Sequence, residues 1–125
     1  EVAGADLADI GTLFIAARES LAADDYRQMV VEAGVDDLVL TKAFTGANAY
    51  YLRRSIERAG LDPDNLSGKT SMNWGQSDTQ LKAWKDIWSA GQSVAAVHRV
   101  EGAGEIIARL RAEYLQSLNV PSFGP

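Results

Sequence analysis

The sequence predicts an α/β chain that opens with a buried strand and continues as a mostly helical domain. Two observations lead to this prediction: an apolar strand-like run at the start of the sequence, and amphipathic helical stripes after it. One buried strand and one short strand cannot satisfy each other's backbone groups as an ordinary sheet. We therefore expect further strands to lie upstream, in a larger enzyme of which this sequence is the C-terminal part.

The first elements follow from their apolar spacing. The buried strand is predicted over residues 7–15, which alternate loosely and are interrupted by Gly11. A glycine within a strand often marks close approach of a backbone or a ligand. Apolar residues then recur at helical spacing over residues 22–33, and Gly34 is a suitable cap. Residues 37–42 are β-prone but short.

Three further helices are predicted. One begins after Thr45-Gly46 and ends at Gly60, and residues 64–76 then form a surface loop. A capping box at Ser77 and Gln80 opens the next helix. The apolar stripes expected on the three helices are Ala49, Leu52, Ile56 and Ala59; Leu81, Trp84 and Trp88; and Ala103, Ile106, Ile107, Leu110 and Tyr114.

Composition excludes several classes of function. The 125 residues carry a net charge of −5, and their lysines and arginines are scattered, which argues against nucleic acid or an anionic membrane as the partner. No apolar run reaches the roughly 18 residues that a membrane helix needs. Cysteine is absent, which excludes disulfides and a thiol nucleophile and suits a cytoplasmic protein. No metal-ligand constellation is present.

The end of the first strand is a candidate phosphate site. In (β/α)8 barrels the phosphate commonly binds in the loops after the last two strands. Gly11 would let a phosphate approach the backbone, and the hydroxyl of Thr12 would add a donor. A Gly-Thr pair alone is also typical of an ordinary turn at a strand end.

A series of motifs favours the phosphate site over an ordinary turn. In order, these are Gly4-Ala5-Asp6, Ile10-Gly11-Thr12-Leu13-Phe14, Glu19-Ser20, Tyr26-Arg27-Gln28, Leu38-Val39-Leu40-Thr41, Phe44-Thr45-Gly46, Leu52-Arg53, Trp88-Ser89-Ala90-Gly91-Gln92 and Glu113-Tyr114. Together they resemble the nitronate monooxygenase family, formerly called 2-nitropropane dioxygenase. The resemblance covers residues 4–62 and 84–115.

This resemblance implies an FMN-dependent (β/α)8 barrel with an added, mostly helical substrate domain. Residues 1–16 would be the last barrel strand and the FMN phosphate loop, 17–96 a helical substrate or cap domain, and 97–125 a C-terminal helix and tail packed back on the barrel. The family's phosphate-binding Gly-Thr carries over to Gly11 and Thr12, with Asp9 and Ile10 flanking the same loop. Asp9 departs from expectation, because its charge does not favour a phosphate.

Other candidate residues have weaker support. The family's catalytic histidine would lie upstream, so no catalytic residue is expected in this chain. His98, the one histidine, is expected to be structural or on the surface. Ser89 and Gln92 are candidates for contact with flavin or substrate, the alternative being a helix-breaking turn. The pair Tyr50-Tyr51 is expected to pack or form an interface, with the substrate cavity as the alternative.

The implied activity is oxidation of an alkyl nitronate by FMN and dioxygen to a carbonyl compound and nitrite. The 125 residues alone would be inactive without the upstream barrel. Flavin-dependent enoyl reductases and quinone reductases have related barrels, so the sequence leaves the identity of the substrate open. It also leaves open whether the protein forms a homo-oligomer. The rival interpretation is a non-enzymatic helical interaction module, and retention of flavin separates it from the enzyme.

Overall fold

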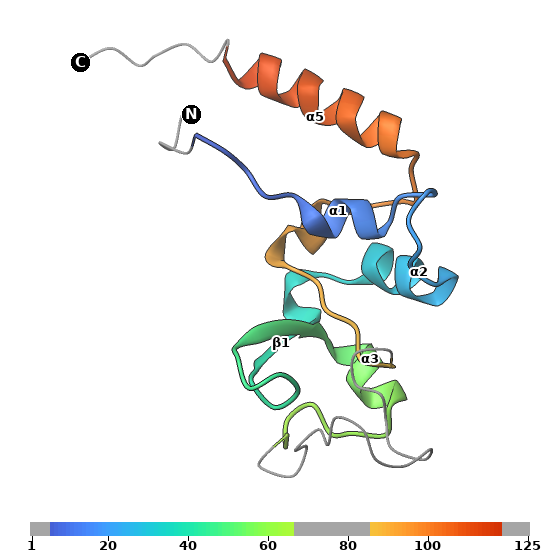
Figure 1. Cartoon of the computed structure of the whole chain (residues 1–125), viewed down its shortest axis with the longest axis vertical. Helices are drawn as coiled ribbons and strands as arrows, with labels where there is room; N and C mark the ends of the chain where they lie inside the picture. The colour runs from blue at the N-terminus through green and yellow to red at the C-terminus, as the bar shows by residue number, and fades with distance from the viewer. Residues whose placement is uncertain (1–5, 67–85, 119–125) are drawn as a thin grey trace, which may run out of the picture.

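A computed structural model describes residues 6–66 and 86–118, which form a mixed α/β unit with one two-stranded sheet. Helices α1 and α5 lie at one end of this unit, and β1 and α3 lie at the other (Figure 1). The elements, in chain order, are α1 (Gly11–Ile15), α2 (Asp24–Glu32), the 3₁₀ helix η1 (Val35–Asp37), β1 (Leu38–Thr41), β2 (Ala49–Leu52), α3 (Arg53–Arg58), the 3₁₀ helix η2 (Gln92–Ala96) and α5 (Ala103–Ser117).

The prediction of a strand over residues 7–15 is wrong: the first half has no regular structure, and the second half forms α1. Residues 6–10 precede this helix without regular structure, and Leu7 is 93% exposed. A strand needs a neighbour for its backbone hydrogen bonds. No other described segment pairs with residues 6–10. From Gly11 onward the chain closes helical hydrogen bonds instead and buries Leu13 in the core.

The predicted helix over residues 22–33 is confirmed as α2. Met29 and Val30 are its buried residues, as expected from the stripe. Asp24 and Asp25 occupy its first turn, where negative charge is favoured by the helix dipole. This helix therefore depends on its own sequence pattern and on a face that the core covers.

The short strand at 37–42 is confirmed as β1, but the helix predicted after Thr45 begins later than expected. Ala49–Leu52 form the strand β2, which pairs antiparallel with β1 in the register Leu38↔Leu52. Gly46 has a φ of 79° in the connection, a conformation that favours glycine. The aromatic pair in β2 suits a strand, and only the following residues form α3.

Two clusters of buried side chains lie on either side of the hairpin's second strand. The larger joins α1, α2, η2 and α5, and the smaller lies between the hairpin, α3 and the chain near residue 87. The larger cluster consists of Leu13, Ala16, Ala17, Met29, Val30, Leu52, Ala90, Val94, Val97 and Ile106. The smaller consists of Phe44, Tyr51, Ile56 and Ile87.

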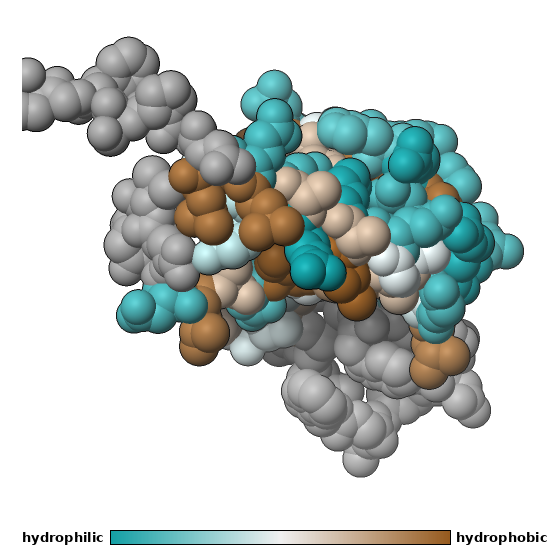
Figure 2. Space-filling view, turned by 90° about the horizontal axis from the view of Figure 1, so that it is seen from above, coloured by the Kyte–Doolittle hydropathy of each residue, from teal (hydrophilic) through white to brown (hydrophobic). Residues whose placement is uncertain are grey.

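The last helix is confirmed as α5, but its predicted buried face is only partly covered. Ile106 is 2% exposed, whereas Ile107 is 58% and Tyr114 is 47% exposed. Residues 111–118 are all exposed, because only the first half of α5 packs against the larger cluster. Viewed from the α5 side, hydrophobic residues gather on this face of the molecule (Figure 2).

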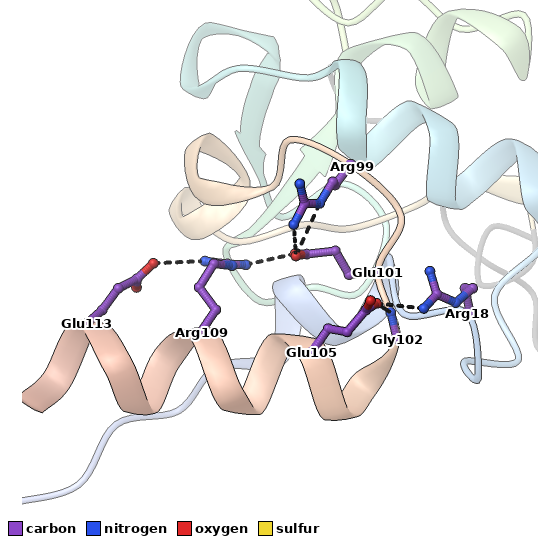
Figure 3. Close-up of polar contacts among 7 residues, drawn as sticks. All are labelled: Arg18, Arg99, Glu101, Gly102, Glu105, Arg109 and Glu113. Carbon is purple, nitrogen blue, oxygen red and sulfur yellow. Dashed lines mark hydrogen bonds and ion pairs between the residues drawn. The ribbon is translucent and has the colours of Figure 1, made fainter.

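Charged side chains anchor the start of α5 (Figure 3). The buried carboxylate of Glu101 accepts hydrogen bonds from Arg109 at 3.0 Å and from Arg99 at 2.9 Å. These two guanidinium groups, Arg109 foremost, lower the pKa of Glu101. The backbone oxygen of the same residue accepts from the N–H of Arg18 at 2.8 Å, so Glu101 also ties α5 to the end of α1.

Two further carboxylates satisfy backbone N–H groups at the first turn of α5. Glu105 accepts from the N–H of Gly102 at 2.6 Å and also pairs with Arg18. Glu19 accepts from the N–H of Ala103 at 2.9 Å. These backbone donors are the main reason that the pKa of each carboxyl is lowered. The helix is thus capped both by its own residue and by one from the N-terminal segment.

Some sequence predictions lie outside the described residues. They are most of the surface loop at 64–76, the capping box at Ser77 and Gln80, and the apolar positions Leu81 and Trp84. Within residues 6–66 and 86–118, no helix has the length and apolar character needed to cross a membrane.

Candidate functional site

A pocket of about 410 Å³ opens where α1, β2 and the segment before η2 meet. Its walls are mostly apolar, and three of the lining residues, Thr12, Tyr50 and Ser89, carry hydroxyl groups. This composition is typical of small-molecule sites, which combine apolar walls with few polar groups. The lining residues are Gly11, Thr12, Ile15, Ala49, Tyr50, Ser89, Ala90 and Gly91.

A hydrogen bond joins the two walls that the sequence places far apart. Thr12 on α1 is 7% exposed, and its Oγ1 accepts from the backbone N–H of Gly91 at 2.8 Å. A Cβ at position 91 would stand 3.2 Å from that Oγ1, so glycine permits this close approach. Because Oγ1 acts as the acceptor here, the hydroxyl proton of Thr12 stays available to a ligand.

The wall at residues 88–91 is attached to β2 and α3 as a short extra strand. Tyr51 and Ser89 form an isolated antiparallel bridge, and the N–H of Leu52 donates to the carbonyl of Trp88 at 2.8 Å. The buried Ser55 completes the attachment, because its Oγ accepts from the N–H of Trp88 at 2.9 Å and donates to the Leu52 carbonyl. The backbone of this wall is therefore held from behind.

A stack of three side chains fixes the same wall from the other side. The rings of Tyr26 and Trp88 stack with centroids 4.8 Å apart, and the guanidinium carbon of Arg58 lies 3.6 Å from the Trp88 ring centroid. The hydroxyl of Tyr26 donates to the carbonyl oxygen of Ser89. Burial raises the pKa of Tyr26, so this phenol stays protonated and keeps its donor at neutral pH.

Tyr50 forms the β2 side of the pocket. Successive residues of a strand point to opposite faces, so Tyr50 faces the pocket while Tyr51 packs in the smaller core cluster. The side-chain nitrogen of Gln92 donates to the Tyr50 hydroxyl oxygen at 3.2 Å. Gln92 does not line the pocket itself but is connected to it through this contact.

The residues that line the pocket are all uncharged. A carboxylate lies close to Gly11, because Oδ1 of Asp9 is 4.0 Å from the point where a Cβ on Gly11 would stand. An anionic ligand would therefore depend on hydroxyl and backbone N–H donors rather than on Lys or Arg.

The sequence-predicted site residues divide into two groups. Gly11, Thr12 and Ser89 line one pocket, although they come from motifs almost eighty positions apart. Asp9 and Ile10 do not line it; Asp9 is exposed, and Ile10 packs against the larger core cluster. His98 is also exposed and outside the lining.

Sequence reasoning placed the substrate cavity second for Tyr50. The residue was expected first to pack or form an interface, with the substrate cavity as the alternative, and residues 49–52 were assigned to a helix. Strand alternation in Ala49–Leu52 is the signal that would have separated Tyr50 from its neighbour.

Among residues 6–66 and 86–118, no group of three or more His, Asp or Glu side chains is placed to hold a metal ion. No family model, curated protein or solved structure matches the chain.

Proposed function

We propose that the chain is the C-terminal part of an FMN-dependent oxidoreductase resembling the nitronate monooxygenases. Its reaction would oxidise alkyl nitronates with dioxygen to a carbonyl compound and nitrite. The observation that carries the proposal is the meeting of Gly11 and Thr12 with Ser89 in one pocket. The sequence assigned these residues separately to the phosphate loop and to the flavin or substrate vicinity.

The pocket suits part of a flavin on three grounds. Its volume of about 410 Å³ falls within the range of ligand sites, about 300–1,000 Å³. Apolar side chains such as Ile15 and Ala90 provide surface for a ring or an aliphatic chain. Hydroxyl groups provide donors for oxygen atoms. The remaining contacts would come from the upstream barrel strands.

The residues of this chain would then hold and orient the cofactor. Thr12 would donate its hydroxyl proton to a phosphate oxygen while still accepting from Gly91. Gly11 would allow close approach, since no atom beyond Asp9 lies within 4 Å of its missing side chain. FMN, when bound, supplies the electron transfer. The wall at Ser89 would be kept in place by Tyr26.

The test is flavin retention by the intact protein and its variants. Thr12→Val removes the hydroxyl while keeping the shape, and Gly11→Val fills the space in which a phosphate would lie. We expect both variants to lose most of their FMN through gel filtration, measured by absorbance near 450 nm. Because the protein itself leaves room at Gly11, loss of flavin there would report on the ligand.

Gly104→Ala is the control, because no atom lies within 4 Å of the added Cβ and the site is on α5, away from the pocket. It should keep flavin like the unmodified protein. An unmodified protein that binds no FMN, or variants as yellow as the unmodified protein, would overturn the proposal.

A second candidate is a non-enzymatic interaction module. Exposed apolar side chains on α5 and directly after it, Ile107 and Leu118 among them, favour it. The two candidates differ in flavin content and in substrate. Flavin with nitrite release from a nitronate supports the enzyme, flavin with reduction of an enoyl compound or a quinone points to the related reductases, and absence of flavin supports the module.

A further inference from the structure

Two residues that carry hydroxyl groups, from distant parts of the chain, line the candidate pocket. Thr12 comes from α1 and Tyr50 from β2, and both are among its few polar lining residues. No lining residue is charged, so recognition of a negative group would fall to neutral donors. Neutral O–H donors make stronger hydrogen bonds to an oxyanion than to an uncharged acceptor.

Within the described part of the chain, the hydrogen bonds of the two hydroxyls use neither of their protons. Thr12 Oγ1 accepts from Gly91, and the Tyr50 hydroxyl oxygen accepts from Gln92 at 3.2 Å. A hydroxyl that accepts one bond can donate another. Gln92 therefore orients Tyr50 as a donor without consuming its proton. From the sequence, Thr12 was expected to bind phosphate, whereas Tyr50 was expected to pack or form an interface, with the substrate cavity as the alternative.

We propose that Tyr50, oriented by Gln92, donates a hydrogen bond to an oxyanion held in this pocket. The inference rests on the proposed function for the identity of that oxyanion, which is either the phosphate of FMN or the nitronate of the substrate. Both groups present a negatively charged oxygen to a neutral donor. Tyr50 would then be a second hydroxyl donor of the pocket, beside Thr12.

The test compares Tyr50→Phe with Tyr51→Phe in the intact protein. Both changes remove one phenol oxygen and keep the ring. The Tyr51 hydroxyl lies 3.5 Å from Thr45 Oγ1, outside the pocket, so its loss is the matched control. Gln92→Met removes the orienting donor and should have a smaller effect in the same direction. Dissociation constants of FMN, riboflavin and inorganic phosphate are measured on flavin-free protein, and KM and kcat for propyl-2-nitronate on loaded protein.

The two sources of the oxyanion give different results. If it is the phosphate, Tyr50→Phe weakens FMN and inorganic phosphate binding by about tenfold or more and leaves riboflavin unchanged. If it is the nitronate, FMN binding is unchanged and KM rises by a similar factor with little change in kcat. Equal behaviour of Tyr50→Phe and Tyr51→Phe in all of these measurements overturns the inference.

Failure of the proposed function has a separate signature. In that case the unmodified protein binds no FMN. If that protein binds inorganic phosphate and Tyr50→Phe weakens the binding, the oxyanion site stands although the flavin proposal fails. If it binds no phosphate either, both the proposed function and the role of Tyr50 are overturned.

Discussion

Both halves of α5 carry apolar side chains, but their surroundings differ. In the first half, Ile106 is buried, the first turn is capped by Glu19 and Glu105, and Glu101 binds Arg109. In the second half, residues 111–118 are all exposed, and Leu118 is among the exposed apolar side chains. The first half is thus held by its neighbours, and the second is held mainly by its own helical hydrogen bonds.

This difference shows how little an apolar stripe says about burial. Helical spacing places Ile106, Leu110 and Tyr114 on one side of the helix. Whether each is covered depends on where the opposing surface ends. In the described chain that surface is the larger core cluster, which reaches Ile106 and, in part, Leu110.

The largest expected effect comes from the matched pair Ile106→Ala and Ile107→Ala, made in this chain. The first removes a fully packed side chain and should lower the free energy of unfolding by about 2–5 kcal/mol. The second removes an exposed one and should change it by no more than about 0.5 kcal/mol. Urea unfolding followed by circular dichroism measures both. Equal losses would mean that the two sides of α5 are covered alike.

The anchoring carboxylates should make stability fall in acid. The pKa of Glu101 is lowered from 4.5, chiefly by Arg109 and then by Arg99. A group whose pKa is lower in the folded state stabilises the fold above its unfolded pKa, and that contribution is lost as the pH falls through the folded value. Glu101→Gln should therefore lower the melting temperature at pH 7 and flatten its decline below about pH 4.5.

The control for this pH series is Ile107→Ala, which alters no titratable group. Its melting temperature should follow the unmodified chain at every pH. A Glu101→Gln variant with an unchanged acid slope would show that the ion pairs around Glu101 do not hold the first half of α5.

The smallest effect is expected in the second half. Leu118→Lys should leave the melting temperature of this chain unchanged, because the side chain is already exposed. In the intact protein Leu118→Lys should lower the melting temperature, because residues 97–125 would pack against the barrel according to the proposed function. A loss in both proteins would mean that the second half of α5 is covered within this chain, and no loss in either would remove that packing from the proposal.

Helix α2, strand β1 and helix α5 could be predicted from the sequence, because each is encoded by local periodicity and suitable flanking residues. The assignments of residues 11–15 and 49–52 were wrong for a different reason. The first lacks a pairing neighbour in the described chain, and the second gains one in β1. Strand formation depends on partners that are distant in sequence, so short apolar runs remain ambiguous.

By itself, the sequence determined the type and position of the strongly periodic elements and identified Gly11, Thr12 and Ser89 as candidate site residues. Only the tertiary structure decided that these three line a common pocket, that Tyr50 joins them, and that Ile107 remains outside the core. The physical reason is that spacing along the chain specifies which side of an element a residue occupies. The surface that meets that side is made by segments far away in the chain. One example is the pocket wall at residues 88–91, whose backbone N–H groups donate to the side chains of Thr12 and Ser55.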